Sequence, residues 1–280
     1  MNIIDKNFLR HAKDALLVHC KHFFPFIGLI CTFTLSGQLI HQGHAHNDYE
    51  HEKPLFGALS YGFTSIEVDI HAYGGVLKVS HDFENCENKP NLEELYIKPL
   101  DSIVQRNNGC VYDIDSSQLT LMIDLKSKPE QSLNRLSKLL KNYDHLFQKY
   151  ESGKTKWGPI IILISGEPPM STWQSINSPY MYLDGRASKD YPPNVRKMIR
   201  RISGNIFTVC SNSALLEGNP FEIEKLSILV SDLYDQGAKE VRFWSTTDRP
   251  EVWQSLLNAG VNIISVDDLQ GFSNFISAQK

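Results

Sequence analysis

The chain has 280 residues, of which 41% are hydrophobic and 21% are charged. This composition is that of a globular protein and excludes a wholly disordered, collagen-like or coiled-coil chain. The formal charge is −4 and no block of Lys or Arg stands out, which argues against a dedicated nucleic-acid binder.

The first 37 residues have the pattern of a targeting segment. Residues 1–22 contain four basic and two acidic side chains, and an uncharged apolar run over 23–35 is followed by small residues. This order is typical of a secretory signal peptide. Because residues 23–40 carry no charge, a retained membrane anchor or a buried helix stays open as an alternative. With either a signal peptide or an anchor, residues 38–280 would be exported, to a periplasm or outside the cell.

Short runs rich in Ile and Val alternate with amphipathic segments through the rest of the chain. The predicted strands are 38–42, 64–70, 119–125, 159–165, 180–184, 205–210, 240–245 and 261–266. The predicted helices are 129–151, 192–203, 221–236 and 250–260, with an extra strand at 76–80 and a helix-like segment at 91–107. Eight strands alternating with helices predict an α/β fold, a TIM-type (β/α)8 barrel that forms a single domain over 38–280.

Three cysteines follow residue 37, and their pairing is open. Cys86 and Cys110 flank a polar segment, and in an oxidising compartment a disulfide between them would close it. Three unrelated thiols, with Cys210 as the third, are the alternative.

Three acidic residues stand at the ends of the second and third predicted strands, where a TIM barrel carries its functional groups. Glu67 and Asp69 are two positions apart and therefore point to the same face, and Asp124 ends the next strand. Carboxylate oxygens suit a hard divalent cation, Ca²⁺ or Mg²⁺, better than zinc. The alternative is that these acids form ion pairs with Lys126 or Arg242.

Two histidines are expected beside this cation, where imidazoles take and give protons. His46 follows the first predicted strand and His81 follows the extra strand. His44 and His46 have the spacing of zinc hydrolases, but His145, inside a predicted helix, is the last histidine, so a His-rich zinc site is not completed.

Several segments together resemble the PLC-like phosphodiesterases. This superfamily includes glycerophosphodiester phosphodiesterases and phosphatidylinositol-specific phospholipases C, all on TIM-type barrels. The His-Asn-Asp-Tyr form at 46–49 looks most like the subgroup related to the fungal altered-inheritance-of-mitochondria protein. The resemblance spans about 41–275, and its segments are Ala45-His46-Asn47-Asp48, Ser65-Ile66-Glu67-Val68-Asp69-Ile70, Gly75-Val76-Leu77-Lys78-Val79-Ser80-His81-Asp82, Ile123-Asp124-Leu125-Lys126, Val241-Arg242-Phe243-Trp244 and Gly260-Val261-Asn262-Ile263-Ile264-Ser265-Val266-Asp267.

The resemblance implies cation-assisted cleavage of a phosphodiester, either a small molecule or a lipid of the glycerophosphodiester or phosphoinositide type. A lipid substrate would bring the protein to a membrane surface. The implied roles are catalysis by His46 and His81, metal binding by Glu67, Asp69 and Asp124, phosphate contact by Lys126, and a place in the substrate pocket for Trp244.

Two departures from the family pattern concern substrate and metal. Asn47 stands where many relatives have Arg, so Arg186 or Arg242 is expected to contact the phosphate instead. Asp124 stands where many have Glu, which leaves the choice between Ca²⁺ and Mg²⁺ open.

Other interpretations remain. A catalytically inactive binding protein on the same barrel is one, although both histidines and all three acids are present. A sugar hydrolase using Glu167 or Glu67 with Asp184 is another. Arg186 could instead pair with Asp184 or Asp190 at the surface. Asp267 and Asp268 read as helix caps.

Overall fold

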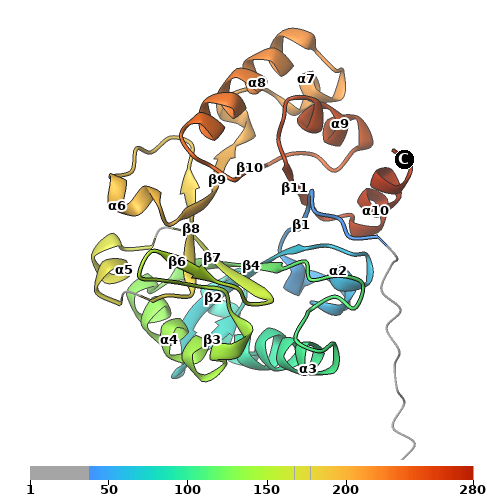
Figure 1. Cartoon of the computed structure of the whole chain (residues 1–280). Helices are drawn as coiled ribbons and strands as arrows, with labels where there is room; N and C mark the ends of the chain where they lie inside the picture. Colours follow the sequence, from blue (N-terminus) through green and yellow to red (C-terminus); the bar gives the residue numbers. More distant parts are fainter. Residues whose placement is uncertain (1–37, 167, 177, 280) are drawn as a thin grey trace, which may run out of the picture. The chain divides into compact units, whose positions relative to one another are not determined.

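The chain closes into a parallel barrel in the computed structural model, which describes residues 38–279 except 167 and 177. The first strand, β1 (Gly43–Ala45), pairs with both the second and the last strand of the wall. The other seven follow in chain order (Figure 1): β2 (Ser65–Tyr73), β4 (Leu119–Ser127), β7 (Ile160–Gly166), β8 (Met181–Arg186), β9 (Ile199–Asn205), β10 (Glu240–Trp244) and β11 (Ile263–Val266). The predicted TIM-type barrel is therefore confirmed.

The remaining elements connect these strands. The α-helices are α2 (Phe56–Ser60), α3 (Lys98–Arg106), α4 (Pro129–Asn142), α5 (Met170–Ile176), α6 (Pro193–Arg196), α7 (Asn212–Leu216), α8 (Pro220–Asp235), α9 (Pro250–Asn258) and α10 (Leu269–Ser277). Shorter helical turns are η1 (Asp48–Glu50), η2 (Phe83–Asn88), η3 (Glu93–Ile97), η4 (Asp144–Leu146) and η5 (Ile206–Thr208). Strand β3 (Val76–Val79) pairs antiparallel with β2, and β5 (Lys149–Glu151) pairs with β6 (Lys154–Lys156). Within the described residues, no helix is both long and apolar enough to cross a membrane.

The two-residue period of the strands separates an apolar layer from a polar interior. On β2, Ile66, Val68 and Ile70 belong to the large core formed with the surrounding helices. The alternate residues Glu67 and Asp69 are buried on the opposite face of the strand. The barrel wall therefore positions two acids in its interior while its outer face stabilises the fold.

A buried arginine crosses this interior. Arg201 on β9 is fully buried, and its Nε donates to Glu240 Oε2 at 2.9 Å. Its Nη2 donates to Ser65 Oγ at 2.9 Å, and its Nη1 lies 3.3 Å from His44 Nδ1. Buried charges persist only when paired and hydrogen-bonded, so β2, β9 and β10 are fixed together by this side chain.

The prediction was wrong around β9. The segment 192–203 was expected to be a helix and 205–210 a strand, whereas only Pro193–Arg196 is helical and the strand covers Ile199–Asn205. The cause is Arg201. A charged residue inside an apolar segment fits the polar face of an amphipathic helix, and a buried strand is the better interpretation only when its partner Glu240 is known.

Two further boundaries differ. The first strand is Gly43–Ala45 rather than 38–42, and at Gly43 an added Cβ would lie 2.6 Å from the Phe63 ring, so close packing requires glycine there. The helix predicted over 129–151 ends at Asn142, although Pro129 does begin it.

The predictions for the cysteines and for the N-terminal segment have different outcomes. Cys86, Cys110 and Cys210 are all free thiols in the structure. The signal or anchor predicted for residues 1–37 lies outside the described residues.

Replacing Arg201 with Met should lower the free energy of unfolding by about 3 kcal/mol, because Glu240 then loses a buried cationic partner. Urea denaturation with an unchanged m-value measures this loss. Arg196→Met is the control: its side chain is 46% exposed, and it should change stability by less than about 0.5 kcal/mol. A loss below about 1 kcal/mol for Arg201→Met would contradict the structural role assigned to the pair.

Candidate active site

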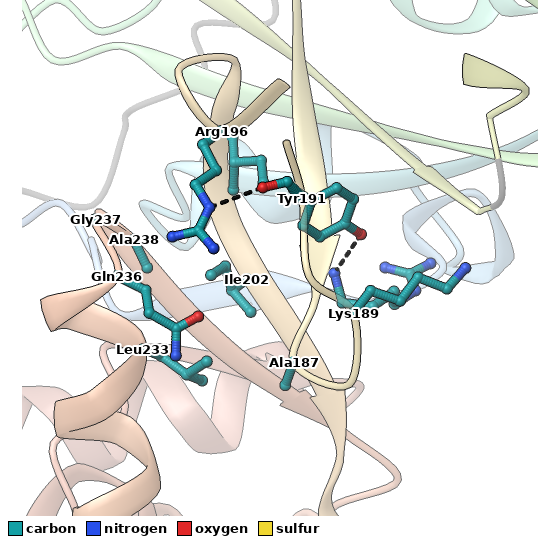
Figure 2. Close-up of a pocket in the computed structure, with 11 residues that line it drawn as sticks. Ala187, Lys189, Tyr191, Arg196, Ile202, Leu233, Gln236, Gly237 and Ala238 are labelled. Carbon is teal, nitrogen blue, oxygen red and sulfur yellow. Dashed lines mark hydrogen bonds between the residues drawn. The ribbon is translucent and has the colours of Figure 1, made fainter. Parts of the chain in front are cut away.

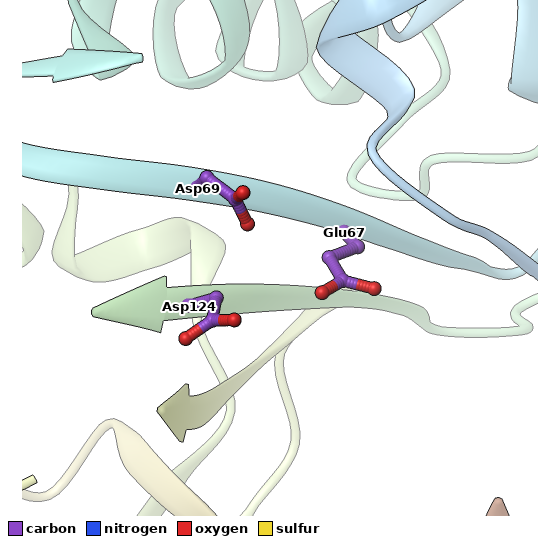
Figure 3. Close-up of side chains that lie close together, drawn as sticks. All are labelled: Glu67, Asp69 and Asp124. Carbon is purple, nitrogen blue, oxygen red and sulfur yellow. The ribbon is translucent and has the colours of Figure 1, made fainter. Parts of the chain in front are cut away.

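Three carboxylates converge at adjacent strands of the wall. Glu67 and Asp69 lie on β2, and Asp69 is directly opposite Asp124 of β4 in the parallel register. One oxygen of each residue lies within 4.8 Å of the others. Figure 3 shows the three side chains close together on the two strands. The residues predicted to hold a cation are therefore brought together.

Lys126 also contacts this cluster. Its Nζ lies 3.1 Å from Asp69 Oδ2 and 3.0 Å from Asp124 Oδ2, and Tyr49 donates its hydroxyl to Asp69 Oδ2 at 2.8 Å. Asp69 Oδ1 is nevertheless buried without a hydrogen-bond partner. Burial, only partly opposed by Lys126, raises the pKa of Asp69 to about 6, and the charges of Glu67 and Asp124 add to this rise.

The unpartnered oxygen supports a cation at this cluster. A buried acceptor without a partner is costly, and a hard divalent cation would satisfy it with the all-oxygen ligands present. The three acids therefore fit Ca²⁺ or Mg²⁺, and the ion pairs with Lys126 form part of the same cluster.

Glu67 is held from the interior of the barrel. Its Oε2 lies 3.0 Å from His44 Nε2 and 3.1 Å from Arg242 Nη1, and all three side chains are buried. Burial would raise the pKa of Glu67, but the Arg242 guanidinium and the His44 hydrogen bond outweigh it and hold the pKa well below its usual range. Glu67 thus stays ionised. Arg242 was expected either to contact the phosphate or to form an ion pair with the acids, and in the structure it forms the ion pair with Glu67.

His46 follows β1 and meets a carboxylate from the far end of the chain. Its Nδ1 lies 2.9 Å from Oδ1 of Asp267, which follows β11. Burial would lower the pKa of His46, but the hydrogen bond to Asp267 and the charge of Glu67 outweigh it and raise the pKa. Asp267 is therefore a partner of His46 rather than a helix cap, whereas Asp268 does cap α10 through the Gly271 N–H.

His81 reaches the same region from β3. The N–H of Ser80 donates to the main-chain oxygen of Asp69 at 3.3 Å, which ties the end of β3 to the acidic strand. The His81 imidazole is 54% exposed, and its Nδ1 lies 2.8 Å from Asp82 Oδ1. Both predicted catalytic histidines are thus paired with a carboxylate.

Arg186 and Trp244 contact each other at the ends of β8 and β10. The Arg186 guanidinium lies 5.3 Å from the centroid of the Trp244 ring. Arg186 donates to Asp184 Oδ2 at 3.0 Å and to the Gly166 carbonyl at 3.0 Å. Gly166 adjoins the cluster, since a Cβ there would lie 2.6 Å from Asp124 Oδ1. Arg186 is therefore near the acids, and it forms the ion pair with Asp184 that the sequence offered as the alternative to a phosphate contact.

A small crevice lies beside the segment that follows β8 (Figure 2). Residues after β8, together with β9 and the end of α8, line it. The Tyr191 hydroxyl accepts a hydrogen bond from the Arg186 N–H at 2.9 Å, and Arg196 Nε donates to the Tyr191 carbonyl at 2.9 Å. None of the three cluster acids lines this crevice. The hydrogen bonds of Tyr191 therefore hold the Arg186 main chain from a side away from the acids.

Sequence reasoning missed three contributors to the site. His44, Tyr49 and Asp267 each bond to a predicted site residue. Tyr49 belongs to the His-Asn-Asp-Tyr motif and could have been found there. Asp267 could be found only by knowing that β1 and β11 are neighbours.

Known proteins are similar to this chain in sequence. The family model described as the AIM6-like phosphodiesterase domain matches residues 37–183. Altered inheritance of mitochondria protein 6 of Eremothecium gossypii is 26% identical over 290 residues, which cover 90% of this chain and 73% of that protein. The homolog of this protein in Arthroderma benhamiae is 27% identical over 264 residues, which cover 83% and 82% of the two chains.

Among solved structures, a glycerophosphodiester phosphodiesterase from Parabacteroides distasonis superimposes with a TM-score of 0.52 and 15% identity, covering 85% of this chain and 98% of that one. At that identity the likeness concerns the fold alone. The family model covers more than half of the chain, and the protein belongs to the AIM6-like phosphodiesterase domain family.

Proposed function

We propose that the protein is a divalent-cation-dependent phosphodiester hydrolase that acts on a glycerophosphodiester or phosphoinositide-type substrate. The observation that carries the proposal is the three-acid cluster, with two carboxylate-paired imidazoles, His46 and His81, on the segments that follow β1 and β3. Membership of a phosphodiesterase family supports the reaction class.

The cation, Ca²⁺ or Mg²⁺, would be held by Glu67, Asp69 and Asp124. When bound, it would polarise a phosphoryl oxygen and offset charge in the transition state. Lys126, whose side chain is partly exposed, adds a second positive charge directed at the phosphate.

His46 would act as the general base. Asp267 accepts the Nδ1 hydrogen, which leaves Nε2 to remove a proton from the attacking hydroxyl, either an internal hydroxyl of the substrate or water. His81, held by Asp82, would donate a proton to the leaving oxygen. When the attacking hydroxyl is the substrate's own, loss of the leaving group gives a cyclic phosphodiester, and the two imidazoles would exchange these roles as water opens that ring in the second half of the reaction.

The second half of the barrel would bind the substrate. Arg242 is engaged by Glu67 and His44, so it stabilises a cation ligand and is not free for the phosphate. Arg186 stacks on Trp244 beside the cluster and would take the phosphate contact that Asn47 cannot make. A lipid substrate and export of the protein, with contact to a membrane surface, belong to the same proposal.

The first test is hydrolysis of bis(p-nitrophenyl) phosphate and of glycerophosphodiesters by the full chain with Ca²⁺, Mg²⁺ or EDTA. We expect EDTA to abolish turnover and His46→Ala to lower kcat/KM by about 10²–10⁴-fold, because a positioned general base is lost. Lys225→Met, at a half-exposed site on α8 whose partner is Glu222, should retain activity. Turnover that EDTA and His46→Ala leave intact would contradict the proposal.

If the protein were instead a catalytically inactive binding protein, the same assays would give a different result. It would bind a cation without turnover on any phosphodiester. Glu67→Gln, titrated beside the wild type, reports whether the acids hold the cation at all.

Cation affinity should fall as the pH drops through about 6. The raised pKa of Asp69 means that the carboxyl is protonated below this pH, so the cation must displace a proton. Calorimetric titrations at about pH 7.5 and about pH 5 should differ by roughly tenfold in affinity. Asp69→Asn should bind more weakly and lose most of this dependence; equal wild-type affinities at both pH values would contradict it.

Asp267→Asn should lower the pKa of His46. The carboxylate favours the imidazolium both through its charge and through the 2.9 Å hydrogen bond, and an amide lacks the charge. NMR titration of the imidazole nitrogens measures the shift. Asp82→Asn, which alters the partner of His81, serves as the matched control and should leave His46 unchanged.

A further inference from the structure

His71 lies two residues beyond Asp69, at the end of β2, and has no place in the proposed chemistry. Its side chain is buried, only 2% exposed. Two contacts account for both of its ring nitrogens. Nδ1 lies 2.8 Å from Ser127 Oγ, and Nε2 lies 3.2 Å from the main-chain oxygen of His81.

The partner of Nε2 fixes the direction of one of these hydrogen bonds. A carbonyl oxygen can only accept, so Nε2 carries a hydrogen and donates it to His81. The Ser127 hydroxyl can donate to Nδ1 or accept from it. His71 therefore links the end of β4 to the main chain of a proposed catalytic residue.

The strand register puts Ser127 within reach of His71. Between Ile70 and His71 the pairing of β2 with β4 shifts by one residue, so that Ile70 pairs with Leu125 and His71 pairs with Ser127. Lys126 is the extra residue of this bulge, and bulges redirect side chains. The same irregularity thus gives Lys126 its acidic partners and gives His71 its hydroxyl partner.

Aromatic packing holds the His81 segment against the same imidazole. Phe83 contacts His71 edge-on, with ring centroids 5.7 Å apart, and contacts Tyr73 at the same distance. Lys128 Nζ lies 4.7 Å from the Phe83 centroid. Because the His81 side chain is half exposed, its direction depends on this support of its main chain.

We propose that His71 is a positioning residue that holds His81 in line with the leaving oxygen of the substrate. This inference rests on the proposed function, in which His81 is the general acid. His71 touches no reacting atom and acts through the His81 carbonyl and the Phe83 ring.

The test compares two leaving groups in His71→Leu. Glycerophosphocholine releases an alkoxide that needs a proton, whereas bis(p-nitrophenyl) phosphate releases a stable phenolate that does not. We expect kcat on glycerophosphocholine to fall by about 10–100-fold with KM within about threefold, because a misplaced acid loses its alignment. The loss on bis(p-nitrophenyl) phosphate should stay within about threefold.

Conservative variants separate positioning from folding. His71→Gln keeps an amide N–H that can reach the His81 carbonyl and should restore most of the loss. Ser127→Ala removes the hydrogen-bond partner of Nδ1 without enlarging the side chain, and should give a smaller selective loss even if His71→Leu fails to fold. His145→Leu, an exposed histidine paired with Asp101, is the control and should match the wild type.

The outcomes are distinguishable. Equal losses on both substrates, a change in KM alone, or no rescue by a folded His71→Gln would overturn the inference while the proposed function stands. A His71→Leu variant as active as the wild type on both substrates would also overturn the inference. A wild type with no turnover on either substrate would overturn the proposed function, and this inference with it.

Discussion

Closure of the sheet at β1 is the constraint on which the site depends. β1 is only three residues long, yet it pairs with β2 on one side and β11 on the other. Parallel strands end at the same rim, so the residue after β1 lies near the carboxyl-terminal halves of β2 and β4 and near the end of β11. His46, the acids and Asp267 are neighbours for that reason, although 221 positions separate His46 from Asp267.

The barrel interior combines paired charges with a small apolar cluster of Met122, Ile161, Leu163 and Tyr182. Arg201 neutralises Glu240, and Arg242 neutralises Glu67, to which His44 is also hydrogen-bonded. Such pairs lose much of their attraction to desolvation, so they contribute little net stability compared with apolar packing. Their effect on the site is chemical: Glu67 stays ionised, whereas Asp69, with an unpartnered buried oxygen, has a raised pKa.

Sequence patterns could predict the barrel and the acidic cluster because both depend on local regularities. Alternation along β2 put Glu67 and Asp69 on one face, and Pro129 marked a helix start. Strand β9 was missed because Arg201 is compatible with a buried strand only through Glu240, a partner from another strand. The pairing of His46 with Asp267 likewise depends on barrel closure, which no local pattern records.

The two halves of the wall have separate tasks in the proposed enzyme. The proposed acid–base residues, the three acids and Lys126 all lie within residues 37–183, the span that the family model matches. Arg186 and Trp244, which would contact the substrate, lie beyond it. A change of substrate therefore calls for changes in the second half, whereas a change of chemistry calls for changes in the first. Asp267 is the exception that joins them, since it comes from the last strand and holds the first histidine.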